Sequence, residues 1–242
     1  MVDLYTACRA LYDQAFPGES EIFTKAMFDR YYPDCLRVIC EDGQPVSMLF
    51  SIPYPLITAA GERDAHYLYA VATHAAHRGK GLAKQLLLAE AARYPVFLRP
   101  MSPSLFDFYK KVGFSPLSPM ETLQGDATAA AGNERHLMPA EFLRLRDALA
   151  PIPHCRPTAT FLSLYQNGGG MVAAGKDTAA IYEKQGEIIL FKEYWGSPDA
   201  APRLSAFLGG SAFRLRRYTA SGTPFGMGVG IPAEAAFLAA LD

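Results

Sequence analysis

Several features that mark particular classes of protein are missing from this sequence of 242 residues. Residues Met1 to Tyr5 carry no basic segment leading into an apolar run, and no stretch approaches the roughly twenty apolar residues that cross a bilayer. We therefore expect a cytoplasmic protein that binds no membrane. Lys and Arg number 23 against 24 Asp and Glu, with the two signs interspersed, so no electrostatic signature for nucleic acid is present.

Cysteine is also scarce. The four cysteines, Cys8, Cys35, Cys40 and Cys155, include no C-x-x-C pair and have no histidine at ligand spacing. We expect reduced thiols, and neither a disulfide framework nor a metal site.

The composition that remains is that of a globular protein. Half of the residues are hydrophobic and 19% are charged, which argues against disorder. The length allows one large or two small domains. Glycine, threonine and alanine in residues 124–132 offer little to pack, so they predict a linker. We expect a domain over 1–123, a linker over 124–135 and a smaller C-terminal α/β domain over 136–242.

Apolar spacing and turn residues predict the order of elements in the first half. The hairpin is indicated by Asp42-Gly43, a strong turn signal between two apolar runs. The expected elements are helices over 3–16 and 21–32, strands over 36–40, 46–50 and 67–73, a helix over 82–94, a strand over 95–99 and a further helix. The first half is therefore predicted to be mixed α/β.

A short loop, Arg78-Gly79-Lys80-Gly81-Leu82-Ala83, joins the third of these strands to the helix that begins at Leu82. A strand that enters a helix through such a turn points backbone N–H groups and the positive helix end at one anion. A Cβ at Gly79 or Gly81 would keep a phosphate oxygen away from the backbone. The loop is a candidate diphosphate site, although a plain turn would use the same residues.

A second segment, Phe108-Tyr109-Lys110-Lys111-Val112-Gly113-Phe114, follows about one helix and one strand later. The loop reads R-G-K-G-L-A and the segment reads F-Y-K-K-V-G-F. The pair resembles the GNAT superfamily of acyl-CoA-dependent N-acyltransferases, whose loop R/Q-x-x-G-x-G/A is followed by F-Y-x-x-x-G-F. The two patterns in this order are specific, whereas either alone is not. The resemblance covers roughly residues 1–120 and implies the GNAT acyltransferase fold.

The resemblance also implies a cofactor site. Acetyl-CoA would be the acyl donor, and no metal would take part. The loop amides would hold the CoA diphosphate, the strand would run beside the pantetheine arm, and two loop cations would contact phosphates unless they are merely solvated. The implied cofactor-binding residues are Val71, Ala72, Thr73, Arg78, Gly79, Lys80, Gly81, Leu82 and Ala83.

Tyr109 is the candidate general acid. The family places this tyrosine at the start of the helix after the fifth strand, beside the thioester sulfur. A phenol with a reference pKa near 10 can protonate a thiolate within hydrogen-bond reach. Its neighbours Phe106, Phe108 and Phe114 leave packing alone as the other interpretation.

No general base stands out in the sequence. None of the candidates has a spacing that outweighs simple exposure, so a base acting through water is the default expectation. The candidates are Glu21, Asp29, His66, His74, Tyr67 and Tyr69.

The second half lacks both patterns, so we expect it to bind no CoA. It is predicted to contain helices over 139–149, 158–165 and 202–208, strands over 171–174, 178–182, 187–194 and 213–218, and a terminal segment over 233–241. The glycines at 168–170 and 209–210 are expected in turns. This order faintly echoes the first half, so a degenerate second GNAT-like copy is one interpretation, without aligned identity to establish it. This half would cover the acceptor cleft or form a subunit contact in a homodimer.

Two functions from different classes follow from these features. The favoured one is an N-acetyltransferase that moves an acetyl or other acyl group from acetyl-CoA to a primary amine of a small molecule or peptide. The alternative is a non-catalytic regulator that binds acyl-CoA. Tyr109 favours the enzyme, since binding alone needs no proton donor. The sequence does not identify the acceptor.

Overall fold

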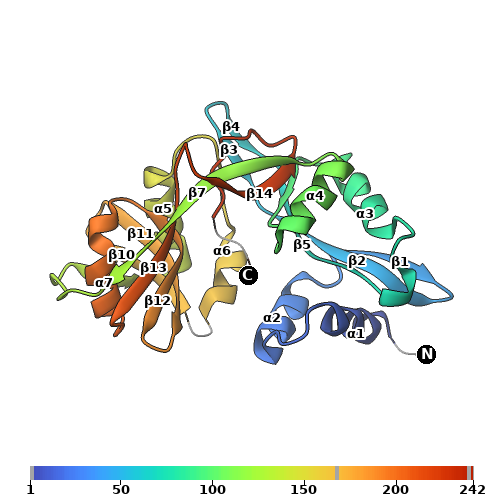
Figure 1. Ribbon diagram of the computed structural model, residues 1–242, viewed down its shortest axis with the longest axis horizontal. Helices are drawn as coiled ribbons and strands as arrows, with labels where there is room; N and C mark the ends of the chain where they lie inside the picture. The colour runs from blue at the N-terminus through green and yellow to red at the C-terminus, as the bar shows by residue number, and fades with distance from the viewer. Residues whose placement is uncertain (1–2, 167–168, 239–240, 242) are drawn as a thin grey trace. The chain divides into compact units, whose positions relative to one another are not determined.

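The computed structural model describes residues 3–166, 169–238 and 241 (Figure 1). The chain forms two compact units, each assembled from separated segments. The first unit comprises Met1–Tyr54, Asp64–Ser115 and Met227–Ile231, and the second comprises Pro55–Arg63, Pro116–Gly226 and Pro232–Asp242. This division differs from the expected contiguous domains on either side of a linker.

The first unit is a mixed α/β layer structure. Its strands follow the order β1-β2-β5-β6-β14, in which β5 and β6 are parallel and the other described pairs antiparallel. The expected order of two helices, hairpin, strand, helix, strand and helix is confirmed. The elements are α1 (Leu4–Ala15), α2 (Glu21–Tyr31), β1 (Leu36–Glu41), β2 (Gln44–Pro53), β5 (His66–Thr73), the 3-10 helix η1 (Ala75–His77), α3 (Leu82–Ala91), β6 (Val96–Leu98), α4 (Pro103–Val112) and the last three residues of β14 (Thr223–Val229).

Local signals in the sequence explain where these elements begin and turn. The carboxylate of Asp3 accepts a hydrogen bond from the Thr6 backbone N–H at 3.0 Å, and so caps α1. Ser20 caps α2 in the same way. Asp42 and Gly43 both have positive φ, 50° and 75°, which a tight hairpin turn of matching twist requires.

Helices cover both faces of this sheet (Figure 1). On the face covered by α1 and α2, the ring of Phe50 lies 5.1 Å from that of Phe28. The preceding residue of β2, Leu49, packs instead with Leu86 of α3 and Tyr109 of α4. Adjacent strand residues point to opposite faces, so one strand contributes to two apolar layers. The two apolar layers fix α2 on one face of the sheet and α3 and α4 on the other.

The second unit contains a larger and a smaller sheet. The larger has the order β14-β7-β13-β12-β11-β10-β8, with β12 and β13 parallel, and the smaller has the order β4-β3-β9. Its further elements are β3 (Leu56–Thr58), β4 (Gly61–Arg63), β7 (Ser115–Asp126), β8 (Glu134–Leu137), α5 (Pro139–Leu149), β9 (His154–Cys155), α6 (Ala159–Leu162), η2 (Ser163–Gln166), β10 (Gly169–Ala174), β11 (Thr178–Gln185), β12 (Ile188–Trp195), η3 (Pro198–Ala200), α7 (Ala201–Phe207) and β13 (Ala212–Tyr218).

Two expectations for this half need correction. The segment expected to be a linker is strand at both ends, because β7 continues to Asp126 and β8 begins at Glu134. Seven residues of β7, Met120 to Asp126, pair with β13, a partner that lies far away in the sequence. Gly169 and Gly170 belong to β10 and not to a turn. Gly168 lies outside the described residues.

A fully buried ion pair lies in the core of the second unit. Arg146 and Glu193 are both 0% exposed, and Arg146 Nε donates to Glu193 Oε1 at 2.7 Å. A second guanidinium nitrogen donates to the Cys155 carbonyl at 2.7 Å, and the guanidinium lies over the Trp195 ring. Because a buried charge requires such partners, each of the two charges depends on the other.

We expect Arg146→Met to lower the free energy of unfolding by about 3–5 kcal/mol, since it leaves a buried carboxylate without its cation. The matched control is Arg135→Met, because the Arg135 and Glu141 side chains are 45% and 39% exposed. That variant should lose less than about 1 kcal/mol. Chemical denaturation measures the free energy of unfolding of both variants. Equal losses would show that burial adds nothing to the contribution of the Arg146–Glu193 pair to stability.

Candidate functional site

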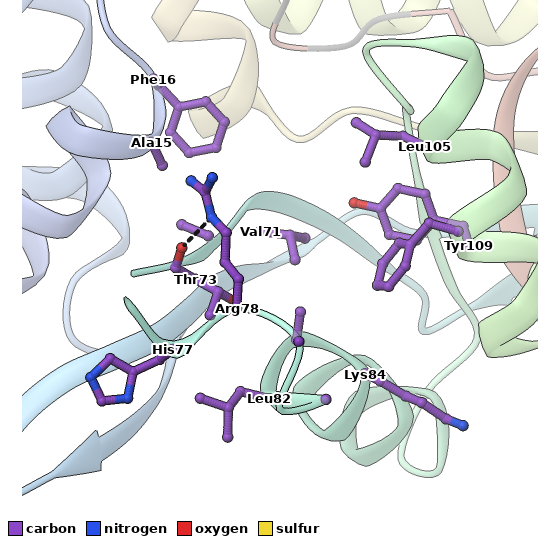
Figure 2. A pocket seen from close by; sticks show the side chains of 15 residues that line it. Ala15, Phe16, Val71, Thr73, His77, Arg78, Leu82, Lys84, Leu105 and Tyr109 are labelled. Atoms are coloured by element: carbon purple, nitrogen blue, oxygen red, sulfur yellow. Dashed lines mark hydrogen bonds between the residues drawn. The ribbon is translucent and has the colours of Figure 1, made fainter. Parts of the chain in front are cut away.

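A cavity of about 570 Å³ opens in the first unit where four segments meet (Figure 2). These segments are the end of α1, the end of β5, the turn between η1 and α3, and α4. The fifteen lining residues are Ala15, Phe16, Val71, Ala72, Thr73, His77, Arg78, Gly79, Gly81, Leu82, Ala83, Lys84, Leu105, Phe108 and Tyr109. The site therefore combines two stretches of backbone with apolar and cationic side chains.

A bulge in β5 lies beside this opening. Met48 lies opposite Ala72 and Phe50 opposite Tyr69, so β5 has one extra residue there, and Ala70 adopts a φ of +52°. Within the described residues, β5 pairs with β6 only at His66 and Tyr67. Beyond Tyr67, therefore, no described residue of β5 pairs with β6.

The bulge also changes which face each side chain reaches. In a regular strand Tyr69 and Val71 would share a face. Instead the Tyr69 hydroxyl lies 2.9 Å from that of Tyr12 on α1, whereas Val71 packs against the apolar cluster that includes Tyr109 of α4. Ser47 fixes the end of the strand, donating to the Ala72 carbonyl at 3.0 Å. Val71, Ala72 and Thr73, which have no pairing with β6 among the described residues, thus line the cavity.

The start of α3 is arranged to bind an anion. Gly79 and Gly81 have φ of +81° and +78°, and Gly81 is the N-cap residue, so no side chain caps the helix. The first N–H groups of a helix have no partner within the helix, and they carry the positive end of its dipole. Leu82, Ala83 and Lys84 supply those groups at the cavity wall.

The charged side chains around this turn have different roles. Arg78 donates to the Thr73 carbonyl at 3.3 Å, and in Figure 2 its guanidinium extends across the cavity toward the end of α1. Lys84 lines the wall. Lys80 does not: its ammonium lies 3.4 Å from a Glu41 carboxylate oxygen and 3.2 Å from His77 Nδ1. None of the described lining residues is acidic, so the wall is cationic at this end.

Tyr109 forms the opposite wall. It is 6% exposed, and Figure 2 shows its hydroxyl pointing into the cavity. Burial raises the pKa of Tyr109 to about 12. The phenol is therefore protonated at neutral pH. Tyr109 lies in the second half of α4 and not at the start of the helix, where the resemblance put it, because α4 already begins at Pro103.

The structure brings together nine of the ten predicted site residues at one cavity, the exception being Lys80. Sequence reasoning missed several lining residues. His77 lies two residues before Gly79, and Lys84 lies three residues after Gly81. Phe16 is the C-cap residue of α1. Their nearness to the glycine turn or to a helix end was the only hint in the sequence that they line the cavity. The remaining residues missed are Ala15, Leu105 and Phe108.

None of the six candidate bases lines the cavity. Two form ion pairs elsewhere, Glu21 with Arg9 and Asp29 with Lys25. His66 Nδ1 lies 2.8 Å from the Ser51 hydroxyl, and burial lowers the pKa of His66. The others are His74, which caps η1, and Tyr67 and Tyr69, which lie in the aromatic layer under α1 and α2.

No three His, Cys, Asp or Glu side chains in residues 3–166, 169–238 and 241 are grouped as metal ligands. Over the same residues, each helix is too short or too polar to span a bilayer.

Comparison with known proteins points to one family. Residues 3–117 match the model of the acetyltransferase (GNAT) domain. A conserved protein of unknown function from Enterococcus faecalis has a TM-score of 0.70 at 13% identity, over 93% of this chain and 69% of that chain. A GCN5-related N-acetyltransferase from Kribbella flavida has a TM-score of 0.67 at 11% identity, again over 93% and 69%.

A third solved structure agrees. The GCN5-related N-acetyltransferase from Anabaena variabilis has a TM-score of 0.67 at 12% identity, over 91% of this chain and 68% of that chain. At such identities the likeness shows the fold alone, and it extends over both units. No curated protein sequence matches the chain. The mixed α/β fold expected from the sequence is confirmed, and over residues 3–117 the family model agrees with the resemblance drawn from the two sequence patterns.

We expect Gly81→Ala to lower the free energy of unfolding by about 1–2 kcal/mol, because a Cβ disfavours the left-handed backbone conformation. The added Cβ would meet no atom within 4 Å, so steric overlap does not contribute. Gly81→Asn is the control: asparagine tolerates this conformation, so the loss should be smaller. Chemical denaturation of both variants measures the difference. An asparagine variant as unstable as the alanine variant would contradict the conformational explanation.

Proposed function

We propose that the protein is an N-acyltransferase that moves an acetyl group from acetyl-CoA to a primary amine, because residues 3–117 match the model of the acetyltransferase (GNAT) domain. One observation carries the proposal: the start of α3, which no side chain caps, and the buried phenol of Tyr109 line the same cavity of about 570 Å³. The acceptor is a small-molecule or peptide amine.

The residues present fit CoA. The N–H groups at the start of α3 and the guanidinium of Arg78 suit the diphosphate. The uncovered edge of β5, from Val71 to Thr73, suits the amide-bearing pantetheine arm, which would bind as an added strand does. When bound, CoA supplies the activated acyl group as a thioester. Lys80 is paired with Glu41, so we assign it no direct contact.

Tyr109 acts as the general acid in this proposal. As the amine nitrogen bonds to the acyl carbon and the carbon–sulfur bond breaks, the phenol proton goes to the departing sulfur. A phenol with a pKa of about 12 is a weak acid toward a thiolate in water, whose conjugate thiol has a lower pKa. Burial raises the pKa of a thiol as well, as it does for buried Cys8, whose pKa is raised to about 11. A thiolate in the same buried site is therefore a stronger base, and the two pKa values lie closer together. The acceptor ammonium loses its proton to water.

The walls beyond the glycine turn are apolar. Phe16 ends α1, and Leu105 and Phe108 belong to α4. These side chains exclude water from the space near the Tyr109 hydroxyl, which favours aminolysis over hydrolysis of the acyl group.

CoA should raise the melting temperature of the whole protein. A ligand that binds only the folded state at 100 times its dissociation constant adds about 2.7 kcal/mol to stability. We expect Arg78→Gln to reduce the shift and Lys80→Gln, its charge-matched control, to leave it nearly unchanged. Thermal shift measurements at several CoA concentrations test this. The absence of a shift at millimolar CoA would refute the proposed cofactor.

Tyr109→Phe should lower kcat by roughly 10²–10⁴-fold while leaving CoA affinity within about twofold, because only the transition state uses the proton. Thiol release across a panel of amines measures turnover. The control Tyr94→Phe removes a hydroxyl outside the cavity and should have little effect. Equal losses of turnover and affinity in Tyr109→Phe would refute the acid role. If the wild-type protein released no thiol with any amine of the panel, the alternative of an acyl-CoA-binding protein without turnover would be favoured.

The dependence of kcat on pH gives a second test of Tyr109. With a pKa of about 12 the phenol keeps its proton below about pH 11, so ionisation of Tyr109 should produce no alkaline fall in kcat between pH 7 and 10. The profiles of wild type and Tyr109→Phe should therefore differ in height and not in shape over that range.

A further inference from the structure

A second cavity of the first unit, of about 540 Å³, lies beside α1. Its ten lining residues come from one face of α1, from the start of β2 and from the segment around η1. His77 lines this cavity as well as the one at the start of α3. The two cavities are therefore neighbours, and the second is called here the α1–β2 cavity.

Apolar side chains contribute half of this lining. Ala7, Ala10 and Leu11 belong to α1, and Pro45 and Val46 belong to β2. Leu11 and Val46 are each only 4% exposed. Because helices and strands otherwise pack closely, a gap between them requires side chains as short as those of the two alanines. A flat apolar group that enters the gap removes its faces from water, which favours binding.

Two glutamine amides of this lining are available to a ligand. Gln14 lies in the last turn of α1 and Gln44 begins β2, so the amides come from two different walls. Both residues are exposed, and neither amide has a hydrogen-bond partner in the part of the chain that the structure describes. Each amide offers an acceptor oxygen beside two N–H donors. A ligand edge with a donor next to an acceptor forms two hydrogen bonds with such an amide, as adenine does through N6 and N7.

Two imidazole rings line the side of this cavity near η1. The backbone N–H of His74 donates to the Val46 carbonyl at 2.9 Å, and His74 Nδ1 accepts from the Ala76 N–H at 3.3 Å. With Nδ1 used as an acceptor, the neutral ring carries its proton on Nε2, which is a donor. The His77 ring lies edge-on to it, with the ring centroids 5.6 Å apart. These rings add flat surfaces against which a planar ligand can stack.

The lining of the α1–β2 cavity carries no permanent charge. Among its described residues there is no Asp, Glu, Lys or Arg, whereas Arg78 and Lys84 line the cavity at the start of α3. A charged group would lose hydration in the α1–β2 cavity without gaining a counter-charge, so a neutral group fits it better. Its volume of about 540 Å³ falls within the roughly 300–1,000 Å³ of small-molecule sites.

We propose that the α1–β2 cavity binds a neutral, planar nucleobase, and that the base is adenine. Its ring faces suit the apolar lining and the imidazoles, and its N6 and N7 edge suits the amide of Gln14 or Gln44. Two kinds of molecule present this base: a free adenine nucleoside, and CoA, in which the base is joined through ribose to the diphosphate. The first source is independent of the proposed function, and only the second rests on it.

Isothermal titration of the full chain with adenosine tests this site. Adenosine has no phosphate, so the positive start of α3 does not attract it. We expect saturable binding to the wild-type protein. The double variant Gln14→Ala/Gln44→Ala should weaken it about tenfold, because it removes the hydrogen bonds to the base edge. Ala10→Phe should fill the gap and weaken binding by about tenfold or more. All three positions are exposed, so the variants should fold, which circular dichroism checks.

The matched control is Gln85→Ala, which changes an exposed glutamine of α3 that lines neither cavity. It should leave the affinity for adenosine within about twofold. Lack of saturable adenosine binding overturns the proposal. Binding that is insensitive to Ala10→Phe, or that weakens equally in the control and in the double variant, overturns it as well.

A second titration, at saturating CoA, distinguishes the two sources of the base. If CoA displaces adenosine from the wild-type protein, the cavity holds the base of CoA, and if adenosine still binds, the ligand is a separate nucleoside. Either result supports the site, provided that Ala10→Phe removes the adenosine binding. If adenosine binds and CoA does not, the proposed function fails while the nucleobase site stands.

Discussion

The geometry of the cavity in the first unit depends on one irregularity in the backbone, the bulge at Ala70. A non-glycine residue at positive φ costs roughly 1–2 kcal/mol, so surrounding contacts have to maintain it. Those contacts include the Tyr12–Tyr69 hydroxyl pair on one face and the apolar packing of Val71 on the other. Among the described residues, β5 pairs with β6 only at His66 and Tyr67, and the bulge lies just beyond them. The strain is thus located beside the cavity.

The cavity satisfies two opposite electrostatic demands by separating them in space. At the start of α3, unpaired N–H groups and Arg78 favour negative charge. At α4, burial keeps the Tyr109 phenol neutral and excludes water. A carrier with a phosphate end and an apolar reactive end meets both conditions. A uniformly polar cleft would bind phosphate but would not keep a reactive acyl group away from water.

The second unit manages charge differently. Arg146 and Glu193 neutralise each other fully inside the core, so that pair serves the fold of the unit.

The sequence alone determined the local elements of the first unit, because capping residues, the Asp42-Gly43 turn and apolar periodicity act over a few neighbouring positions. It also carried the resemblance to the GNAT superfamily, through the glycine turn and the Phe108-Tyr109 segment. Tertiary structure decided the rest. The end of α1 reaches the cavity and Lys80 leaves it for Glu41, since those contacts join residues far apart in the chain. The long strand β7, hidden in a glycine-rich stretch, exists because β13 pairs with it.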